Sequence, residues 1–221
     1  TKRKGGWKKY HSLKGIEYFP CLKKLEMNNI NIGNPNISKN KLLQSVRLYN
    51  TFTTYVNVNK NVRLKRLYIS SEVSMVGKRS LKNIDVSHNK QLEELTLIRG
   101  ISAIDVSNLS KLRMLIIGEG KLKTLDVSHN PELQILSCGG NQLTELDVSA
   151  CTKLSSFTCE KNQLKVVKLP ENLTLVNFEC HKNQLTELDM KNGKVTGEMK
   201  FDTKCSVVNY AGTIHNDLMN K

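Results

Sequence analysis

The chain has 221 residues, of which 38% are hydrophobic and 24% are charged, and its formal net charge is +14. This composition allows a sizeable buried core, and the sequence contains no run of 18 apolar residues that would span a membrane. The charge is uneven: residues 1–70 carry 15 Lys and Arg against two acidic residues, and residues 71–221 carry 19 against 18, so the excess that attracts polyanions lies in the first third.

Residues 1–21 precede the first repeated unit and form a basic lead-in followed by an expected N-terminal cap. The Gly5-Gly6 pair after the first basic residues is typical of a flexible segment. A stack of repeats exposes its first core layer unless a cap covers it. The apolar residues expected to cover that layer are Trp7, Tyr10, Ile16, Tyr18 and Phe19.

Residues 22–190 repeat with a period of about 21 residues. Each unit carries a Leu-x-x-Leu-x-Leu motif, which places alternate apolar side chains on the inner face of a strand. The last apolar positions of the motifs are Met27, Leu48, Ile69, Leu97, Ile117, Cys138, Cys159 and Cys180. Their spacings are 21, 21, 28, 20, 21, 21 and 21, with an insertion near residues 71–79 and a deletion near Gly100. About eight strands follow, and Met199 and Phe201 continue the spacing as a ninth.

A second motif marks the opposite wall of each unit. The sequence Leu-Asp-Val-Ser occurs at residues 125–128 and 146–149, with Ile-Asp-Val-Ser at 84–87 and 104–107. Its apolar residues are expected to point inward. Three asparagines, Asn141, Asn162 and Asn183, follow the strands by three residues, and they are expected to form a ladder that satisfies buried backbone groups at the bend.

One unit of 21 residues has too little apolar surface to close a core, so each must pack on its neighbours. The predicted fold is an α/β-type leucine-rich-repeat solenoid, a right-handed horseshoe with a parallel concave sheet. So short a unit has little room for a helix, and extended or 3₁₀ segments are expected on the convex side. Residues 191–221 are expected to form the C-terminal cap.

Residues 141–149, with Cys138 ahead of them, resemble the 21-residue repeats of bacterial surface proteins. They are most similar to the internalin-J-type adhesins of Listeria and related proteins of Bacteroidetes, and the resemblance covers roughly residues 15–190. The first five repeats depart from it because they lack the ladder cysteine. The resemblance implies a binding protein that is extracellular or at the bacterial cell surface, and it does not specify a ligand.

No catalytic residue, metal site or cofactor is predicted. The G-x-S-x-G, P-loop and H-E-x-x-H motifs are absent from the sequence. A straight column of cysteines cannot surround a zinc ion tetrahedrally, so Cys138, Cys159 and Cys180 are interpreted as small core hydrophobes. The other three, Cys21, Cys151 and Cys205, fall outside the column and are expected to be unpaired.

The histidines and aspartates of the second motif are interpreted as surface residues. His88 and His129 occupy the same turn position in two repeats. An outward stripe is predicted for Asp85, Asp105, Asp126, Asp147 and Asp189. A calcium ladder is conceivable there, but no glycine-rich nonapeptide accompanies the stripe and lysines lie near it, which favours a solvated face.

The outward strand positions of the concave sheet predict the binding surface. A basic and aromatic group comprises Arg47, Tyr49, Arg66 and Tyr68. An apolar group comprises Ile98, Met114, Ile116 and Ile135. Tyr and Arg are enriched at binding hot spots, and an exposed apolar patch usually marks a contact site. The simpler alternative is that β-branched residues favour strands, or that a terminal segment covers the patch.

Three non-catalytic functions remain. The leading one is protein recognition or adhesion through the concave face, with a partner whose identity the sequence leaves open and with a monomer expected. The second is electrostatic binding of a polyanion, of which acidic glycan is the favoured kind and nucleic acid is not, through Lys24, Arg47, Lys65 and Arg66. The third is a spacer with no ligand.

Overall fold

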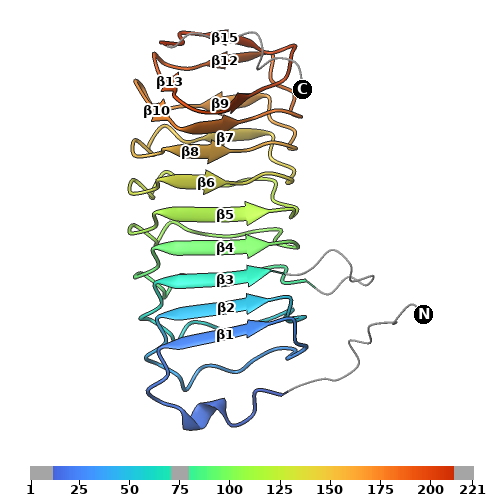
Figure 1. The fold of residues 1–221 in the computed structure, drawn as a ribbon, viewed down its shortest axis with the longest axis vertical. Coiled ribbons are helices and arrows are strands. Elements are labelled where there is room, and N and C mark those ends of the chain that lie inside the picture. Colours follow the sequence, from blue (N-terminus) through green and yellow to red (C-terminus); the bar gives the residue numbers. More distant parts are fainter. Residues whose placement is uncertain (1–11, 71–79, 212–221) are drawn as a thin grey trace, which may run out of the picture.

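The computed structural model describes residues 12–70 and 80–211. The repeats stack along one long axis, and the described chain begins at one end of the stack and finishes at the other (Figure 1). The insertion predicted at residues 71–79 lies outside the described residues, as do Trp7 and Tyr10.

One side of the stack is a nine-stranded parallel sheet with one short strand from each repeat. Its strands, in order, are β1 (Lys24–Asn28), β2 (Ser45–Tyr49), β3 (Arg66–Ser70), β4 (Glu94–Ile98), β5 (Met114–Gly118), β6 (Ile135–Ser137), β8 (Ser156–Thr158), β11 (Asn177–Glu179) and β14 (Met199–Lys200). This is the sheet that the sequence predicts for the concave side, and β14 is the predicted ninth strand. The leucine-rich-repeat solenoid is therefore confirmed.

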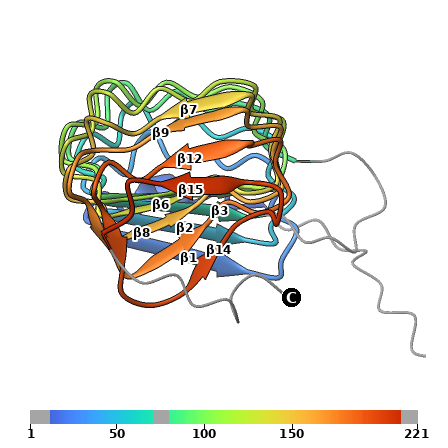
Figure 2. The same ribbon diagram turned by 90° about the horizontal axis from the view of Figure 1, so that it is seen from above.

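The opposite side, here called the back wall, is made of the segments that contain the Leu-Asp-Val-Ser motif or its equivalent. Seen from above, β7 and β9 lie across the core from the sheet (Figure 2). The paired strands are β7 (Glu145–Asp147) with β9 (Val166–Lys168) and β12 (Glu187–Asp189) with β15 (Ser206–Val208). A further pair, β10 (Thr174–Leu175) with β13 (Lys194–Val195), lies on the turns that lead into β11 and β14.

Helix is almost absent from the described residues, as the short repeat predicts. The single helical element there is one 3₁₀ turn, η1 (Ile16–Tyr18). No helix in that part of the chain is long and apolar enough to cross a membrane.

The core lies between the two walls and is continuous along the stack. In each sheet strand the inward residues are buried because the strand alternates between its two faces, as in β2, where Val46 and Leu48 are 1% and 0% exposed. Parallel pairing in register keeps equivalent residues side by side, so Leu48 lies beside Ile69. Phe157 and Phe178 continue the parallel column that begins with Val46 and Leu67, with ring centroids 5.5 Å apart.

The predicted asparagine ladder is present in the C-terminal half. The Nδ2 of Asn162 donates to the carbonyl oxygens of Cys138 and Cys159, at 3.1 and 3.0 Å, and its Oδ1 accepts from the Leu143 amide at 3.1 Å. Asn141 and Asn183 make the equivalent bonds one repeat away on either side. Each asparagine thus bonds backbone groups of its own repeat and of the preceding one.

A second asparagine ladder, which the sequence analysis missed, runs through the turn that follows the back wall. Its members, each fully buried, are Asn40, Asn61, Asn89 and Asn130. The Nδ2 of Asn61 donates to the carbonyl oxygens of Ile37 and Asn40 in the preceding repeat, at 3.0 and 2.9 Å. Cys151 takes the next place, with its Sγ 3.6 Å from the Val127 carbonyl oxygen.

The predicted cap over the first repeat is wrong for two of its residues. Tyr18 and Phe19 are 81% and 63% exposed, whereas Ile16 packs against the core. The 3₁₀ turn points only Ile16 inward. The turn is held instead through its backbone, because the Asn40 Nδ2 donates to the carbonyl oxygens of Ile16 and Phe19 at 2.8 and 3.0 Å.

We predict that Asn162→Ala lowers the free energy of unfolding by about 2–3 kcal/mol, because the buried Leu143 amide loses its acceptor and two carbonyls each lose a donor. Urea denaturation followed by circular dichroism measures the change. The exposed neighbour Gln163 supplies the matched control, Gln163→Ala. Equal stability of the two variants would contradict the structural role of the ladder.

Candidate functional site on the sheet face

The outward surface of the nine-stranded sheet, here called the sheet face, brings the predicted basic and aromatic residues together at β2 and β3. Parallel register places Arg47 beside Tyr68. The guanidinium carbon of Arg47 lies 4.0 Å from the Tyr68 ring centroid and 5.7 Å from that of Tyr49. The two tyrosine rings are 6.4 Å apart and tilted. Cation–π attraction therefore holds the arginine over the rings.

Part of the positive charge near this group is neutralised locally. The Lys24 ammonium lies 2.8 Å from the Glu26 carboxylate, and Arg47 lies 3.7 Å from the same group. The hydrogen bond from Lys24 lowers the pKa of Glu26. Lys65 pairs with Glu93 at 3.0 Å. Of the four polyanion candidates, only Arg66 makes no ion pair within the described residues; it lines a shallow hollow of about 600 Å³ with Lys24 and Arg47.

The predicted apolar residues also meet on the sheet face. Met114 lies beside Ile135, Ile116 lies between Thr96 and Ser137, and Ile98 lies beside Gly118. The four apolar side chains are half-buried rather than protruding. Two outward residues of neighbouring strands, Ser70 and Thr96, are only 5% and 8% exposed because larger side chains flank them. The result is a flat apolar surface, here called the apolar patch and made of Ile98, Met114, Ile116 and Ile135.

Beyond the apolar patch the sheet face becomes charged. Glu160, Glu179, His181 and Lys200 follow on the last repeats. Lys200 lies 3.8 Å from Glu179 and 2.6 Å from Glu198, and its pKa is raised by the hydrogen bond to Glu198. The His181 Nδ1 lies 4.0 Å from the Glu179 carboxylate. The sheet face is therefore basic and aromatic at one end, apolar in the middle and mixed in charge at the other.

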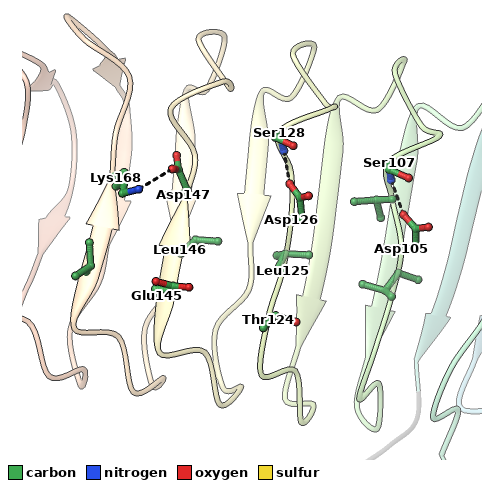
Figure 3. Close-up of a pocket in the computed structure, with 13 residues that line it drawn as sticks. Asp105, Ser107, Thr124, Leu125, Asp126, Ser128, Glu145, Leu146, Asp147 and Lys168 are labelled. Carbon is green, nitrogen blue, oxygen red and sulfur yellow. Dashed lines mark hydrogen bonds and ion pairs between the residues drawn. The ribbon is translucent and has the colours of Figure 1, made fainter.

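A separate groove of about 590 Å³ lies on the back wall of the middle repeats (Figure 3). Asp105, Asp126, Asp147 and Lys168 stand in a row along it, and Leu125 and Leu146 form part of its lining. The paired strands β7 and β9 line one part of the groove, and no backbone hydrogen bond joins residues 124–127 to 144–148 in the described chain.

The aspartate stripe of this wall has a structural use. Each carboxylate accepts the amide of the residue two places later, as Asp126 does from Ser128 at 2.9 Å, and these turns lower the pKa of the aspartates. Asp147 also pairs with Lys168 at 3.3 Å. Within residues 12–70 and 80–211, no group of three or more His, Cys, Asp or Glu side chains is placed to hold a metal ion. His88 and His129 are exposed turn residues that contact the preceding serine, as predicted.

The cysteine column is confirmed as part of the core. Cys138, Cys159 and Cys180 are fully buried, and all six cysteines are free thiols. Burial raises the pKa of each of the three, and it raises the pKa of Cys151 to about 11. Neutral buried thiols are poor nucleophiles and poor metal ligands, so the column supports packing rather than chemistry.

These features define a leucine-rich-repeat solenoid with a buried cysteine column. Among solved structures it is similar to the functional domain of InlJ from Listeria monocytogenes, which includes a cysteine ladder, with 24% identity, a TM-score of 0.58 and coverage of 90% of this chain and 51% of that one. A leucine-rich-repeat protein from Leptospira interrogans matches with 19% identity, a TM-score of 0.60 and coverage of 88% and 52%.

A plant receptor-kinase ectodomain from Arabidopsis thaliana, solved in complex with Casparian strip integrity factor 2, matches with 14% identity, a TM-score of 0.52 and coverage of 92% of this chain and 32% of that one. All three identities are below 25%, so the likeness shows the fold. The chain spans about half the length of the two bacterial structures. No protein-family profile matches the sequence, and the comparison with curated proteins gives no match.

We predict that a thiol reagent labels one cysteine of six in the native chain at pH 8, namely the exposed Cys21, and that Cys21→Ser abolishes labelling. Mass spectrometry of the labelled chain counts the sites. Rapid labelling of Cys138, Cys159 or Cys180 would contradict the closed core.

The free energy of unfolding should fall as the pH rises above about 8.5, because the unfolded thiols then release protons that the buried thiols retain.

Proposed function

We propose that the chain is a non-catalytic recognition module that binds a protein partner through the sheet face, from the Arg47–Tyr68 group to the apolar patch. The observation that carries the proposal is that tyrosine, arginine and aliphatic side chains of the adjacent strands β2 to β6 share one face of the sheet. A rigid parallel sheet holds these residues in fixed register, so binding costs little conformational entropy. Tyrosine and arginine beside a flat apolar area are typical of interface centres.

We further propose that the module acts outside a bacterial cell or at its surface, as an adhesin or a related binding protein. Two bacterial proteins share the fold, and one of them has the same kind of cysteine column. The plant ectodomain was solved with a bound partner, which supports the use of such solenoids for recognition.

Polyanion binding is the second candidate, and one observation favours it. Arg66 lacks an ion-pair partner among the described residues and lines the hollow at the basic end. Against this, Glu26 and Glu93 pair with the other three candidate cations, Lys24, Arg47 and Lys65. The four candidate cations thus face two carboxylates, and an excess of two charges supplies only a small part of the counterion release on which strong polyanion binding depends. The spacer function is weaker, because it gives no reason for an apolar patch on the sheet face.

We predict that Ile116→Lys lowers affinity for a partner at least tenfold without unfolding the chain, because a charge placed in the centre of the apolar patch must be desolvated on binding. The probe is the set of peptides enriched from a random 12-residue phage-displayed library on the immobilised chain, with affinity measured by fluorescence anisotropy. Val166→Lys is the matched control, because Val166 is an exposed valine on β9 of the opposite wall. Equal binding by wild type and Ile116→Lys would contradict a role of the apolar patch in binding.

We predict that the double variant Arg47→Gln/Arg66→Gln binds heparin almost as the wild type does. Affinity is measured at several salt concentrations between about 50 and 200 mM, where the slope of log affinity against log salt counts the charge contacts. The wild-type and variant slopes should agree. A slope smaller by about two in the variant, one for each lost contact, would favour the polyanion function instead.

A further inference from the structure

A gap in the row of side chains adjoins the apolar patch. Gly118 and Gly139 occupy the last outward position of two successive repeats, where β4 has Ile98 and the repeat after them has Glu160. A Cβ placed on Gly118 would lie 3.7 Å from the Ile98 Cδ1, in ordinary contact with it. Gly118 is half-buried and Gly139 is buried, so the open part of the gap lies over Gly118, between the isoleucine and the glutamate.

The carboxylate of Glu160 occupies part of this gap. It lies so close over Gly139 that a Cβ on that glycine would overlap it. Its Oε2 is buried and has no hydrogen-bond partner within the described residues. No ion pair of Glu160 is found there either, although the neighbouring Glu179 has both Lys200 and His181 within 4.0 Å. A desolvated carboxylate oxygen without a donor is costly, and such a group in a native structure calls for an explanation.

We propose that Glu160 is an anchor for a basic side chain of the partner, a lysine or arginine that enters over Gly118 while an adjacent apolar side chain rests on the apolar patch. The inference rests on the proposed function of the sheet face and specifies its partner: a polypeptide segment with a basic residue next to a hydrophobic one. Gly118 is the entry, because a larger residue there would fill the space that the incoming side chain needs, and Gly139 leaves room for the Glu160 carboxylate.

The charge around Glu160 supports this choice. Its lateral neighbours are Gly139, which has no side chain, and His181, whose Nδ1 lies 4.0 Å from the Glu179 carboxylate. The nearby Ser137 and Thr158 are neutral and already bond each other, with the Thr158 hydroxyl donating to Ser137 at 2.8 Å. The next cation along the face, Lys200, is engaged by Glu179 and Glu198. No described side chain therefore neutralises Glu160, and a donor from the partner would do so in a partly desolvated site, where a charge-assisted hydrogen bond is strong.

Thermal unfolding separates an anchor from a structural carboxylate and needs no partner. Glu160→Gln keeps the shape and removes the uncompensated charge, so its Tm should equal or exceed that of the wild type. Glu145→Gln, on the back-wall strand β7, is the matched control for loss of one exposed charge. A Tm lower than both by more than about 3 °C would overturn the proposal, because it would show that the carboxylate already has a stabilising partner in the fold.

Binding tests the anchor directly, with the peptides enriched from the random 12-residue library on the immobilised wild-type chain. We expect them to share a lysine or arginine within three residues of a large apolar residue. Glu160→Gln should weaken their binding at least tenfold and Glu145→Gln less than twofold. Replacing the basic residue of a peptide by norleucine should lower its affinity for the wild type at least tenfold as well. The same replacement should hardly change the affinity for Glu160→Gln, as coupled partners require.

The binding results distinguish failure of the Glu160 anchor from failure of the proposed function of the sheet face. Peptides that lose affinity on Ile116→Lys but bind Glu160→Gln as tightly as wild type would overturn the anchor and leave the proposed function standing. A selection without any peptide that distinguishes wild type from Ile116→Lys would overturn the proposed function, and the anchor with it.

Discussion

The constraint on which the structure depends is the satisfaction of buried backbone groups at every turn of the solenoid. A chain that bends between two walls leaves carbonyl oxygens inside, and two columns of asparagine provide donors for them, as Asn61 and Asn162 illustrate. Each of these asparagines bonds the preceding repeat, so the same side chains that satisfy the turns fix the register of the sheet. A rigid sheet face, with side chains at predictable positions, follows from this.

Much of the fold could be predicted because the apolar period is almost constant. The spacing from Met27 to Cys180 defines the sheet strands, and its continuation to Met199 defines the ninth. The second asparagine ladder was accessible too, since Asn40, Asn61, Asn89 and Asn130 each stand three residues before the strand motif. It was not predicted because each of these asparagines lies in a turn, where an exposed polar residue is the ordinary expectation. The exposure of Tyr18 and Phe19 could not be predicted, because one 3₁₀ turn decides which side chain points inward.

The sequence predicts which side chains point outward from the sheet, but it does not predict the contacts that these side chains make with one another. Alternation along a strand identifies outward residues, so Arg47, Tyr68 and Ile116 were placed on the correct face. Alternation does not reveal lateral contacts. The stacking of Arg47 on Tyr68 and the pairing of Lys24 with Glu26 depend on side-chain conformations, and they turn an apparently basic surface into an aromatic and partly neutralised one. The unpaired oxygen of Glu160 likewise becomes visible only when its neighbours are in place.

The two walls of the solenoid differ in what their side chains do. On the back wall the aspartates serve the turns, whereas on the sheet face the aromatic and apolar side chains have no evident structural need to be so arranged. The central claim is therefore that the sheet face binds. Amide hydrogen exchange of the full chain, with and without an enriched library peptide, tests it most directly. The account predicts added protection at β3 to β6 and none on the back wall. Protection confined to residues 104–107, 124–128 and 145–147 would contradict it.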